Sequence, residues 1–118
     1  MTFSYTLIHR VSLCVFSLSG RIIGESDLDK ILVEITNVFG SKKNELIFNL
    51  EELEYVNSAG INFFMRTLTK ARINNGDLIF CGVKNAVENL FKIAKLNRIY
   101  TIYSSENEAI NHFKKEVE

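Results

Sequence analysis

Ser58 stands out for its setting, in the stretch YVNSAGINFF at residues 55–64. It lies between an apolar run and a segment with helical periodicity, so it is predicted at or next to the first residue of a helix. The amino-terminal end of a helix favours negative charge, and a phosphate adds about 1.5 to 2 negative charges. Phosphorylation of Ser58 would therefore leave the helix intact and place a hydrated dianion on the surface. Since Asn and Ser are preferred N-caps, a purely capping role for Asn57 or Ser58 stays open.

Phe63 is the second residue of interest in this stretch. The apolar stripe predicted to face the core consists of Ile61, Phe64, Met65, Leu68 and Ala71, with Arg72 at its edge. Phe63 falls outside that stripe when the residues are placed at helical spacing. An exposed aromatic side chain beside a modification site would suit an anchor for a protein partner. A single exposed apolar residue without a role is the other interpretation, because such residues are common.

The remaining polar residues do not converge on a catalytic or metal site. His9 and His112 have no cysteine or carboxylate at metal-ligand spacing, which favours structural or surface roles. The segment GRIIG at 20–24 lacks the lysine and hydroxyl of a phosphate-binding loop and is predicted as a strand-to-helix turn. The glutamates at 51–54 are interpreted as a solvated acidic loop, since a receiver-type phosphoacceptor would be an aspartate at a strand end. We therefore expect no enzyme, no cofactor and no metal.

Composition predicts one soluble globular domain over residues 1–118. The chain is 47% hydrophobic and 24% charged, which suits a domain with its own core. Fourteen basic residues balance fourteen acidic ones, so the chain lacks the basic surface of nucleic-acid-binding proteins. No apolar stretch reaches the length of a membrane span and no leader is recognised, so we expect a cytoplasmic protein without membrane insertion.

Cys14 and Cys81 lie far apart in two apolar runs. Buried, reduced thiols in a reducing cytoplasm are the favoured interpretation. A disulfide between neighbouring strands is the alternative.

Hydrophobic periodicity predicts an opening hairpin followed by alternating helices and strands. Strands are predicted at 3–8, 11–18, 45–50, 77–81 and 99–103, and helices at 26–39, 58–74, 84–95 and after Ser105. Ser26 with Asp29, and Ser105 with Glu108, resemble capping boxes. Helices between successive strands imply right-handed crossovers. The fold class is therefore α/β, with a mixed, mostly parallel sheet of about five strands and about four helices.

Four segments together resemble the STAS domain of anti-sigma factor antagonists, over nearly the whole chain. They are LSGRI at 18–22, LIFNLEELEYVNSAG at 46–60, INFFMRTLTKARINNGDLIFCGV at 61–83 and FKIAKLNRIYTIYSSENEAI at 91–110. The most specific match is Asn57-Ser58-Ala59-Gly60, which corresponds to the family's Asp-Ser-Ser/Ala-Gly loop. The resemblance implies a STAS-like single domain.

The resemblance also implies a mechanism. Such domains bind a serine kinase that is itself an anti-sigma factor, which frees the sigma factor for transcription. The kinase then phosphorylates a serine at the start of the second helix, the antagonist dissociates, and a PP2C-type phosphatase resets it. By position, the phosphoacceptor is Ser58. Ala59 stands where many relatives have a second hydroxyl, and Asn57 stands where many carry aspartate.

The expected partner-binding surface surrounds Ser58 on the predicted second helix and the segments before it. Its members are Gly20, Arg21, Gly24, Glu54, Tyr55, Asn57, Ala59, Gly60, Asn62, Phe63 and Arg66. The alternative is a structural STAS subunit of a transporter or stress-sensing complex, in which the same surface docks permanently and Ser58 stays unmodified.

Overall fold

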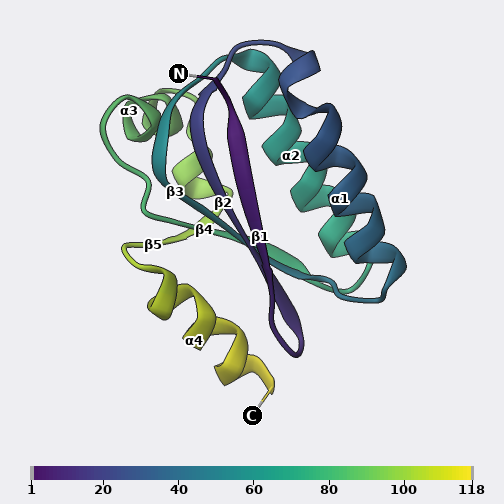
Figure 1. Ribbon diagram of the computed structural model, residues 1–118. Helices are drawn as coiled ribbons and strands as arrows, with labels where there is room; N and C mark the ends of the chain where they lie inside the picture. Colours follow the sequence, from purple (N-terminus) through teal and green to yellow (C-terminus); the bar gives the residue numbers. More distant parts are fainter. Residues whose placement is uncertain (1, 118) are drawn as a thin grey trace.

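The computed structural model describes residues 2–117, with side chains described as far as residue 114, as one five-stranded sheet with four α-helices (Figure 1). The strands are β1 (Ser4–His9), β2 (Leu13–Ile22), β3 (Glu45–Val56), β4 (Asp77–Cys81) and β5 (Thr101–Tyr103). The helices are α1 (Asp29–Gly40), α2 (Ser58–Ile73), α3 (Asn85–Ile93) and α4 (Glu106–Val117). The strands lie in chain order, with β1 antiparallel to β2 and every later pair parallel. The predicted α/β class and mixed sheet are confirmed.

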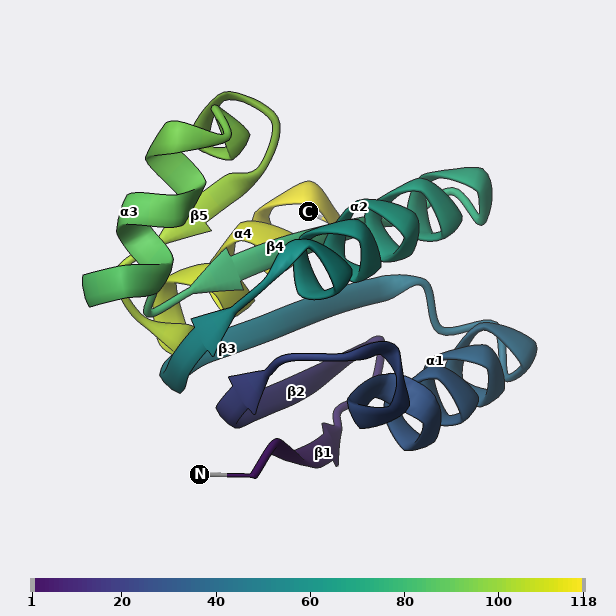
Figure 2. The same cartoon turned by 90° about the horizontal axis from the view of Figure 1, so that it is seen from above.

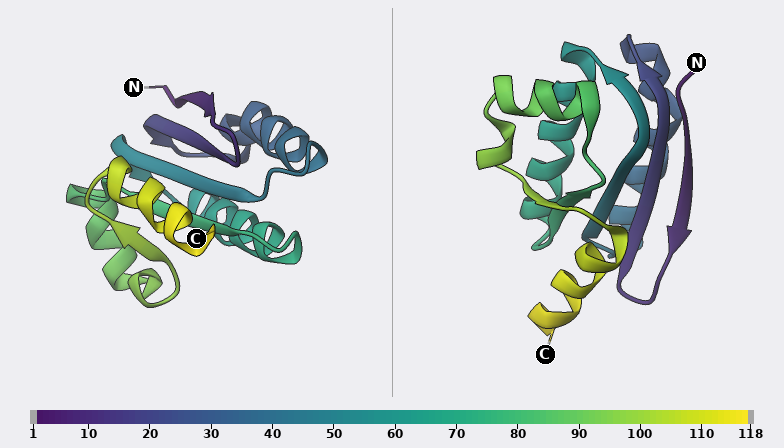
Figure 3. Two further views of the ribbon diagram at one scale, coloured as in Figure 1. Left: turned by 90° about the horizontal axis from the view of Figure 1, so that it is seen from below. Right: turned by 90° about the vertical axis from the view of Figure 1, so that its left-hand side faces the viewer.

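The two faces of the sheet bury two separate apolar clusters. The larger contains Phe16, Phe48 and Phe80 from the strands and buried side chains of α1, α2 and α3. The smaller joins Val15, Ile47 and Ile79 to α4. Figure 2 shows α1 and α2 side by side on one face, and the right-hand view of Figure 3 shows α4 in front of the strands with α1 and α2 behind them. The alternation of side chains along each strand supplies both clusters.

β3 is longer than predicted and contains the glutamates at 51–54. Its pairing with β2 continues to Ile22 and Val56, although β4 ends opposite Asn49. Glu51, Glu52 and Glu54 are exposed, so the prediction of solvent exposure is confirmed and that of a loop is wrong. Open water on one side of this stretch permits charged side chains within a strand.

Gly20 lies inside β2, not in a turn. It has φ +85°, and the pairing with β3 shifts register between Gly20 and Arg21, as in a β-bulge. A Cβ atom on Gly20 would lie 2.2 Å from the carbonyl oxygen of Thr2. The turn that was predicted over residues 20–24 is therefore limited to Ile23 and Gly24, between β2 and a short 3₁₀ helix, Glu25–Leu28.

The first helical segment is capped by a residue other than the predicted one. The Asp27 carboxylate accepts hydrogen bonds from the backbone N–H groups of Ile23 (3.0 Å) and Gly24 (3.2 Å). The predicted Ser26–Asp29 box is therefore wrong. The box at α4 is confirmed, because the Ser105 hydroxyl accepts from the Glu108 N–H (3.3 Å) and donates to its carboxylate (3.1 Å).

Both cysteines are buried free thiols, as the favoured interpretation predicted. Cys14 belongs to the larger cluster and Cys81 to the smaller one, on opposite faces of the sheet. The alternative of a disulfide is therefore wrong. Within residues 2–117, no helix combines the length and apolar character needed to cross a bilayer.

Candidate functional site at the start of α2

Asn57 is the N-cap of α2, which leaves Ser58 as the first helical residue. Asn57 has an extended backbone, and its Oδ1 accepts from the N–H groups of Ala59 (3.0 Å) and Gly60 (3.4 Å). Ser58 is exposed, and its hydroxyl has no hydrogen-bond partner among the described residues. Of the two capping alternatives, the one on Asn57 is therefore confirmed. The Ser58 hydroxyl is accessible to an external reagent.

The other end of the Asn57 amide holds the end of β2. Nδ2 donates to the carbonyl oxygen of Ile23 at 2.6 Å, and the Asn57 backbone N–H donates to Ile22 at 3.1 Å. One side chain thus joins the β2–α1 connection to the start of α2. The sequence alone predicted the cap but not this second contact.

The ends of β2 and β3 lie side by side next to this cap. Arg21 and Tyr55 are opposite each other in the strand pairing, and the Arg21 guanidinium lies 4.8 Å from the centre of the Tyr55 ring. This distance permits a cation–π interaction. Arg21 and Glu54 are exposed, and Tyr55 and Gly24 are half-buried. The structure therefore brings these predicted surface residues together.

On α2 itself, the predicted surface is only partly exposed. Asn62 and Arg66 follow Ser58 at four-residue spacing and are exposed, while Ala59 is half-buried. Gly60 is buried, and a Cβ there would lie 2.9 Å from Val56 Cβ. Gly60 therefore permits close packing of α2 on β3 and does not contribute a contact surface.

Phe63 is not an exposed anchor, and this prediction is wrong. Its side chain is 0% exposed and stacks on Phe48 with ring centres 5.6 Å apart. The buried residues of α2 are Gly60, Phe63, Phe64, Thr67, Leu68 and Ala71. They follow a regular three-and-four spacing that begins at Gly60, whereas the prediction began the stripe at Ile61. The prediction overlooked Gly60 as a member of the buried face. A glycine can lie on the buried face of a helix, and counting from Gly60 would have included Phe63.

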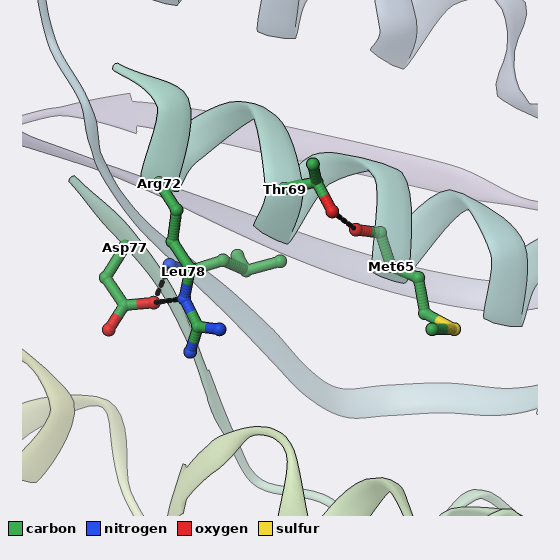
Figure 4. Close-up of polar contacts among 5 residues, drawn as sticks. All are labelled: Met65, Thr69, Arg72, Asp77 and Leu78. Carbon is green, nitrogen blue, oxygen red and sulfur yellow. Dashed lines mark hydrogen bonds and ion pairs between the residues drawn. The ribbon is translucent and has the colours of Figure 1, made fainter. Parts of the chain in front are cut away.

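Two exposed apolar side chains near the site were not predicted. Ile23 is 63% exposed, and Met65 is 42% exposed although it was assigned to the buried stripe. In Figure 4 the Met65 side chain extends from α2, and the Thr69 hydroxyl donates to the Met65 carbonyl (3.0 Å). Further along, Arg72 forms an ion pair with Asp77 (3.6 Å), which ties the end of α2 to the start of β4. Ile22, the last residue of β2, is buried, while Ile23 in the turn after it is exposed.

The electrostatics at the start of α2 favour an anion. The first turn contains no acidic residue, so the partial positive charge of the helix end is not neutralised there.

The two histidines lie elsewhere and have structural contacts, as predicted. His9 Nδ1 lies 3.3 Å from Cys14 Sγ, and His112 Nδ1 lies 2.8 Å from the Tyr103 hydroxyl. Among the described side chains, no three of His, Cys, Asp or Glu gather as a metal site.

Comparison with known proteins identifies the protein family to which this chain belongs. The family model of the STAS domain matches residues 4–109, so the chain belongs to the STAS domain family. BtrV of Bordetella bronchiseptica, named as an anti-sigma factor antagonist, is 22% identical over 93 residues, which cover 79% of this chain and 80% of BtrV.

Solved structures show the same fold. The anti-sigma factor antagonist SpoIIAA in its unphosphorylated form is 19% identical with a TM-score of 0.82, and the match covers 95% of this chain and 97% of that one. The Bacillus cell fate determinant SpoIIAA in its phosphorylated form is 18% identical with a TM-score of 0.75, covering 93% and 99%. This chain thus has the fold of the anti-sigma factor antagonists.

Proposed function

We propose that this protein is an anti-sigma factor antagonist whose binding is switched by phosphorylation of Ser58. It binds an anti-sigma factor serine kinase and thereby releases the sigma factor. The kinase transfers a phosphoryl group from ATP to the Ser58 hydroxyl, and the phosphorylated protein dissociates. A PP2C-type phosphatase removes the phosphate. In this cycle the protein is a cytoplasmic substrate of two enzymes and not itself an enzyme.

The observation that carries the proposal is the unoccupied hydroxyl of Ser58 at an intact helix start. Because Asn57 satisfies the Ala59 and Gly60 N–H groups, modification of Ser58 removes no hydrogen bond within the described part of the fold. A dianion at this position is also favoured by the helix dipole, typically by about 0.3 to 1 kcal/mol. Phosphorylation is therefore compatible with the folded state, and its effect falls on whatever binds the surface.

The proposed contact surface surrounds Ser58 at the start of α2. It consists of the half-buried Tyr55 and five exposed residues, Arg21, Ile23, Glu54, Asn62 and Arg66. Ile23 takes the apolar role that was first assigned to Phe63, while Gly20, Gly60 and Phe63 support the surface from within. A hydrated phosphate on Ser58 would have to be desolvated against a flat partner, which makes binding unfavourable.

The relatives support this proposal through their fold. SpoIIAA has been solved in a phosphorylated and an unphosphorylated form, and both resemble this chain along most of its length. The same architecture therefore exists in both states in a relative.

A second candidate function is a permanently docked structural STAS subunit of a transporter or stress-sensing complex. Asn57 favours it, because this residue lacks the negative charge that the family's aspartate places beside the acceptor. In that case the same surface binds a partner and Ser58 stays unmodified.

Phosphate mapping separates the two. We expect incubation with ATP and the anti-sigma factor kinases of the source organism to place one phosphate on the wild-type protein and none on Ser58→Ala, as read by intact-mass and phosphopeptide spectrometry. Ser26→Ala is the matched control, because Ser26 is also an exposed serine at the start of a helical segment. It should be phosphorylated like the wild type. Equal phosphate in wild type and Ser58→Ala would remove Ser58 from the mechanism.

Binding to the kinase gives the second readout. Ser58→Asp is expected to reduce capture by the immobilised kinase while its unfolding midpoint stays close to that of the wild type. Undiminished capture of Ser58→Asp, with no phosphate on the wild type, would favour the permanently docked subunit.

A further inference from the structure

A pocket opens at the end of the sheet opposite Ser58. It lies between the turn that joins β1 to β2, residues 10–13, and the second half of α4. Leu13 in this turn pairs with Glu45, the first residue of β3, whereas Ser58 follows the other end of that strand. Figure 1 shows the β1–β2 turn and the far end of α4 at the same end of the molecule. The pocket is therefore separate from the candidate site at the start of α2.

The inner side of the pocket is apolar. It is formed by Leu13, Ile110 and Phe113, which are buried members of the smaller apolar cluster. The pocket thus opens directly onto the core between the sheet and α4. Its volume of about 400 Å³ falls in the range of small-molecule sites, about 300 to 1,000 Å³. A hydrocarbon group placed here would lose contact with water against a preformed apolar surface.

The outer rim of the pocket is positively charged. Arg10 comes from the β1–β2 turn and Lys114 from α4, and both are exposed. Neither side chain forms an ion pair within the described structure, where the recorded pair is Arg72 with Asp77. Ser12 adds a hydroxyl to the rim, and no acidic residue is among the described residues that line the pocket. Such a rim complements an anionic group, because hydrogen bonds from arginine and lysine to an anion are charge-assisted.

We propose that this pocket binds an amphiphilic anion, a single acyl chain that ends in a carboxylate. The acyl chain lies on Leu13, Ile110 and Phe113, and the carboxylate accepts hydrogen bonds from Arg10 and Lys114. The apolar side alone would suit any hydrocarbon, and the two cations alone would suit any small anion. Their combination in one pocket requires a ligand with both parts. Val11, which is fully exposed at the rim, gains an apolar contact with the chain.

A free fatty acid fits this pocket better than an anionic membrane does. A bilayer offers the same chemistry, but its acyl chains are already surrounded by other chains, so their transfer to the pocket gains little. A free chain leaves water when it enters. The proposed ligand is therefore the soluble acid.

The ligand would bridge the β1–β2 turn and α4 without touching Ser58. Occupancy of the pocket is then an input to the protein that is independent of phosphorylation. Because α4 packs on the smaller cluster, a ligand held by both elements also fixes this helix against the sheet.

Titration with sodium decanoate tests the pocket, with isothermal calorimetry for affinity and heteronuclear NMR for location. The wild type should bind decanoate saturably, with shifts at the amides of Leu13, Ile110 and Phe113 and none at Asn57 or Ser58. Decanol, which lacks the charge, and acetate, which lacks the chain, should each bind at least about tenfold more weakly.

Rim variants test the two cations. Arg10→Gln and Lys114→Gln should each raise the dissociation constant for decanoate by about tenfold and leave that for decanol unchanged. Lys92→Gln is the matched control, because Lys92 is an exposed lysine near the end of another helix, α3, and does not line the pocket. It should bind decanoate like the wild type. All three positions are exposed, and circular dichroism confirms that the variants are folded.

Four results would overturn the proposal. They are a wild type that does not bind decanoate saturably, shifts that lie away from the pocket, decanol binding as tight as that of decanoate, and equal effects of Lys92→Gln and Lys114→Gln. Binding to phosphatidylglycerol vesicles without binding to free decanoate would also overturn it and identify a membrane surface instead. None of these measurements involves the kinase, so their outcome is independent of the proposed switch at Ser58.

Discussion

At the scale of single residues, the neighbours Asn57 and Ser58 have separate roles at the site. Asn57 makes the hydrogen bonds that start α2 and hold Ile23, and Ser58 makes none among the described residues. A residue that stabilises the fold is thereby separated from one that is available for modification. An aspartate in place of Asn57 would keep the acceptor but could not donate to the Ile23 carbonyl.

This division predicts the stability of three variants. Asn57→Ala should lower the free energy of unfolding by about 1 to 2 kcal/mol, because it removes both the cap and the hydrogen bond to the Ile23 carbonyl. Asn57→Asp also loses the bond to Ile23 but should cost less than Asn57→Ala, since the carboxylate still caps and interacts favourably with the helix dipole by about 0.3 to 1 kcal/mol. Ser58→Ala should change it by less than about 0.5 kcal/mol. Urea unfolding measures all three, and a Ser58→Ala loss as large as that of Asn57→Ala would identify Ser58 as the cap.

Local patterns predicted the start of α2 well and its buried face less well. The N-cap and the place of Ser58 follow from residue types within a few positions of one another. The burial of Phe63 depends on how α2 is rotated against Phe48, which lies in the preceding strand β3. That rotation is set by the close approach at Gly60, and periodicity counted from Ile61 does not contain it.

At the scale of elements, strand bounds were predictable where turn residues enclose them. β4 has the predicted bounds, 77–81, with Gly76 before it and Gly82 after it. β3 was underestimated because glutamates interrupt its apolar run, although pairing with β2 continues. The bulge at Gly20 was missed for a similar reason, since the glycine is required by its neighbours Thr2 and Phe3 and not by a turn.

Two glycines in different settings test this account. Gly20→Ala should cost about 2 to 4 kcal/mol, because an alanine is strained at φ +85° and its Cβ overlaps the Thr2 carbonyl. Gly40→Ala is the control, since a Cβ there has nothing within 4 Å and Gly40 ends a helix. It should be neutral or stabilising by up to about 1 kcal/mol. Thermal unfolding of both variants is the measurement, and similar midpoints would contradict the steric argument.

At the scale of the whole molecule, the sheet separates two cores of unequal size. The larger contains a network of aromatic rings from Phe16 through Phe48 and Phe80 to Tyr100. The sequence indicated which residues are apolar and in what period, and hence a layered α/β fold. It did not indicate that α4 is the helix that packs on the smaller cluster in the described structure, because periodicity identifies the buried face of a helix but not which face of the sheet that helix covers.

The smaller core contains Cys81, whose titration should couple to the stability of the whole fold. Burial raises the pKa of the Cys81 thiol to about 12, and the nearby Glu106 and Glu51 add to the shift. In the unfolded chain this thiol titrates near its ordinary pKa of about 8.5. Between these two values the unfolded state has lost a proton that the folded state retains, so the free energy of unfolding falls as pH rises.

Urea unfolding at a series of pH values from neutral to alkaline measures this loss. In the wild type, the contribution of Cys81 to the free energy of unfolding should be complete below about pH 8 and should be lost progressively above that pH. In Cys81→Ala, the free energy of unfolding should fall less steeply with pH, because the titrating thiol is absent. Cys14→Ala is the matched comparison. Burial also raises the pKa of Cys14, but Lys43 opposes the shift, so its removal should flatten the profile less. Parallel profiles for the wild type and Cys81→Ala would show that the Cys81 thiol titrates alike in the folded and unfolded chains, which a side chain sealed between the sheet and α4 should not do.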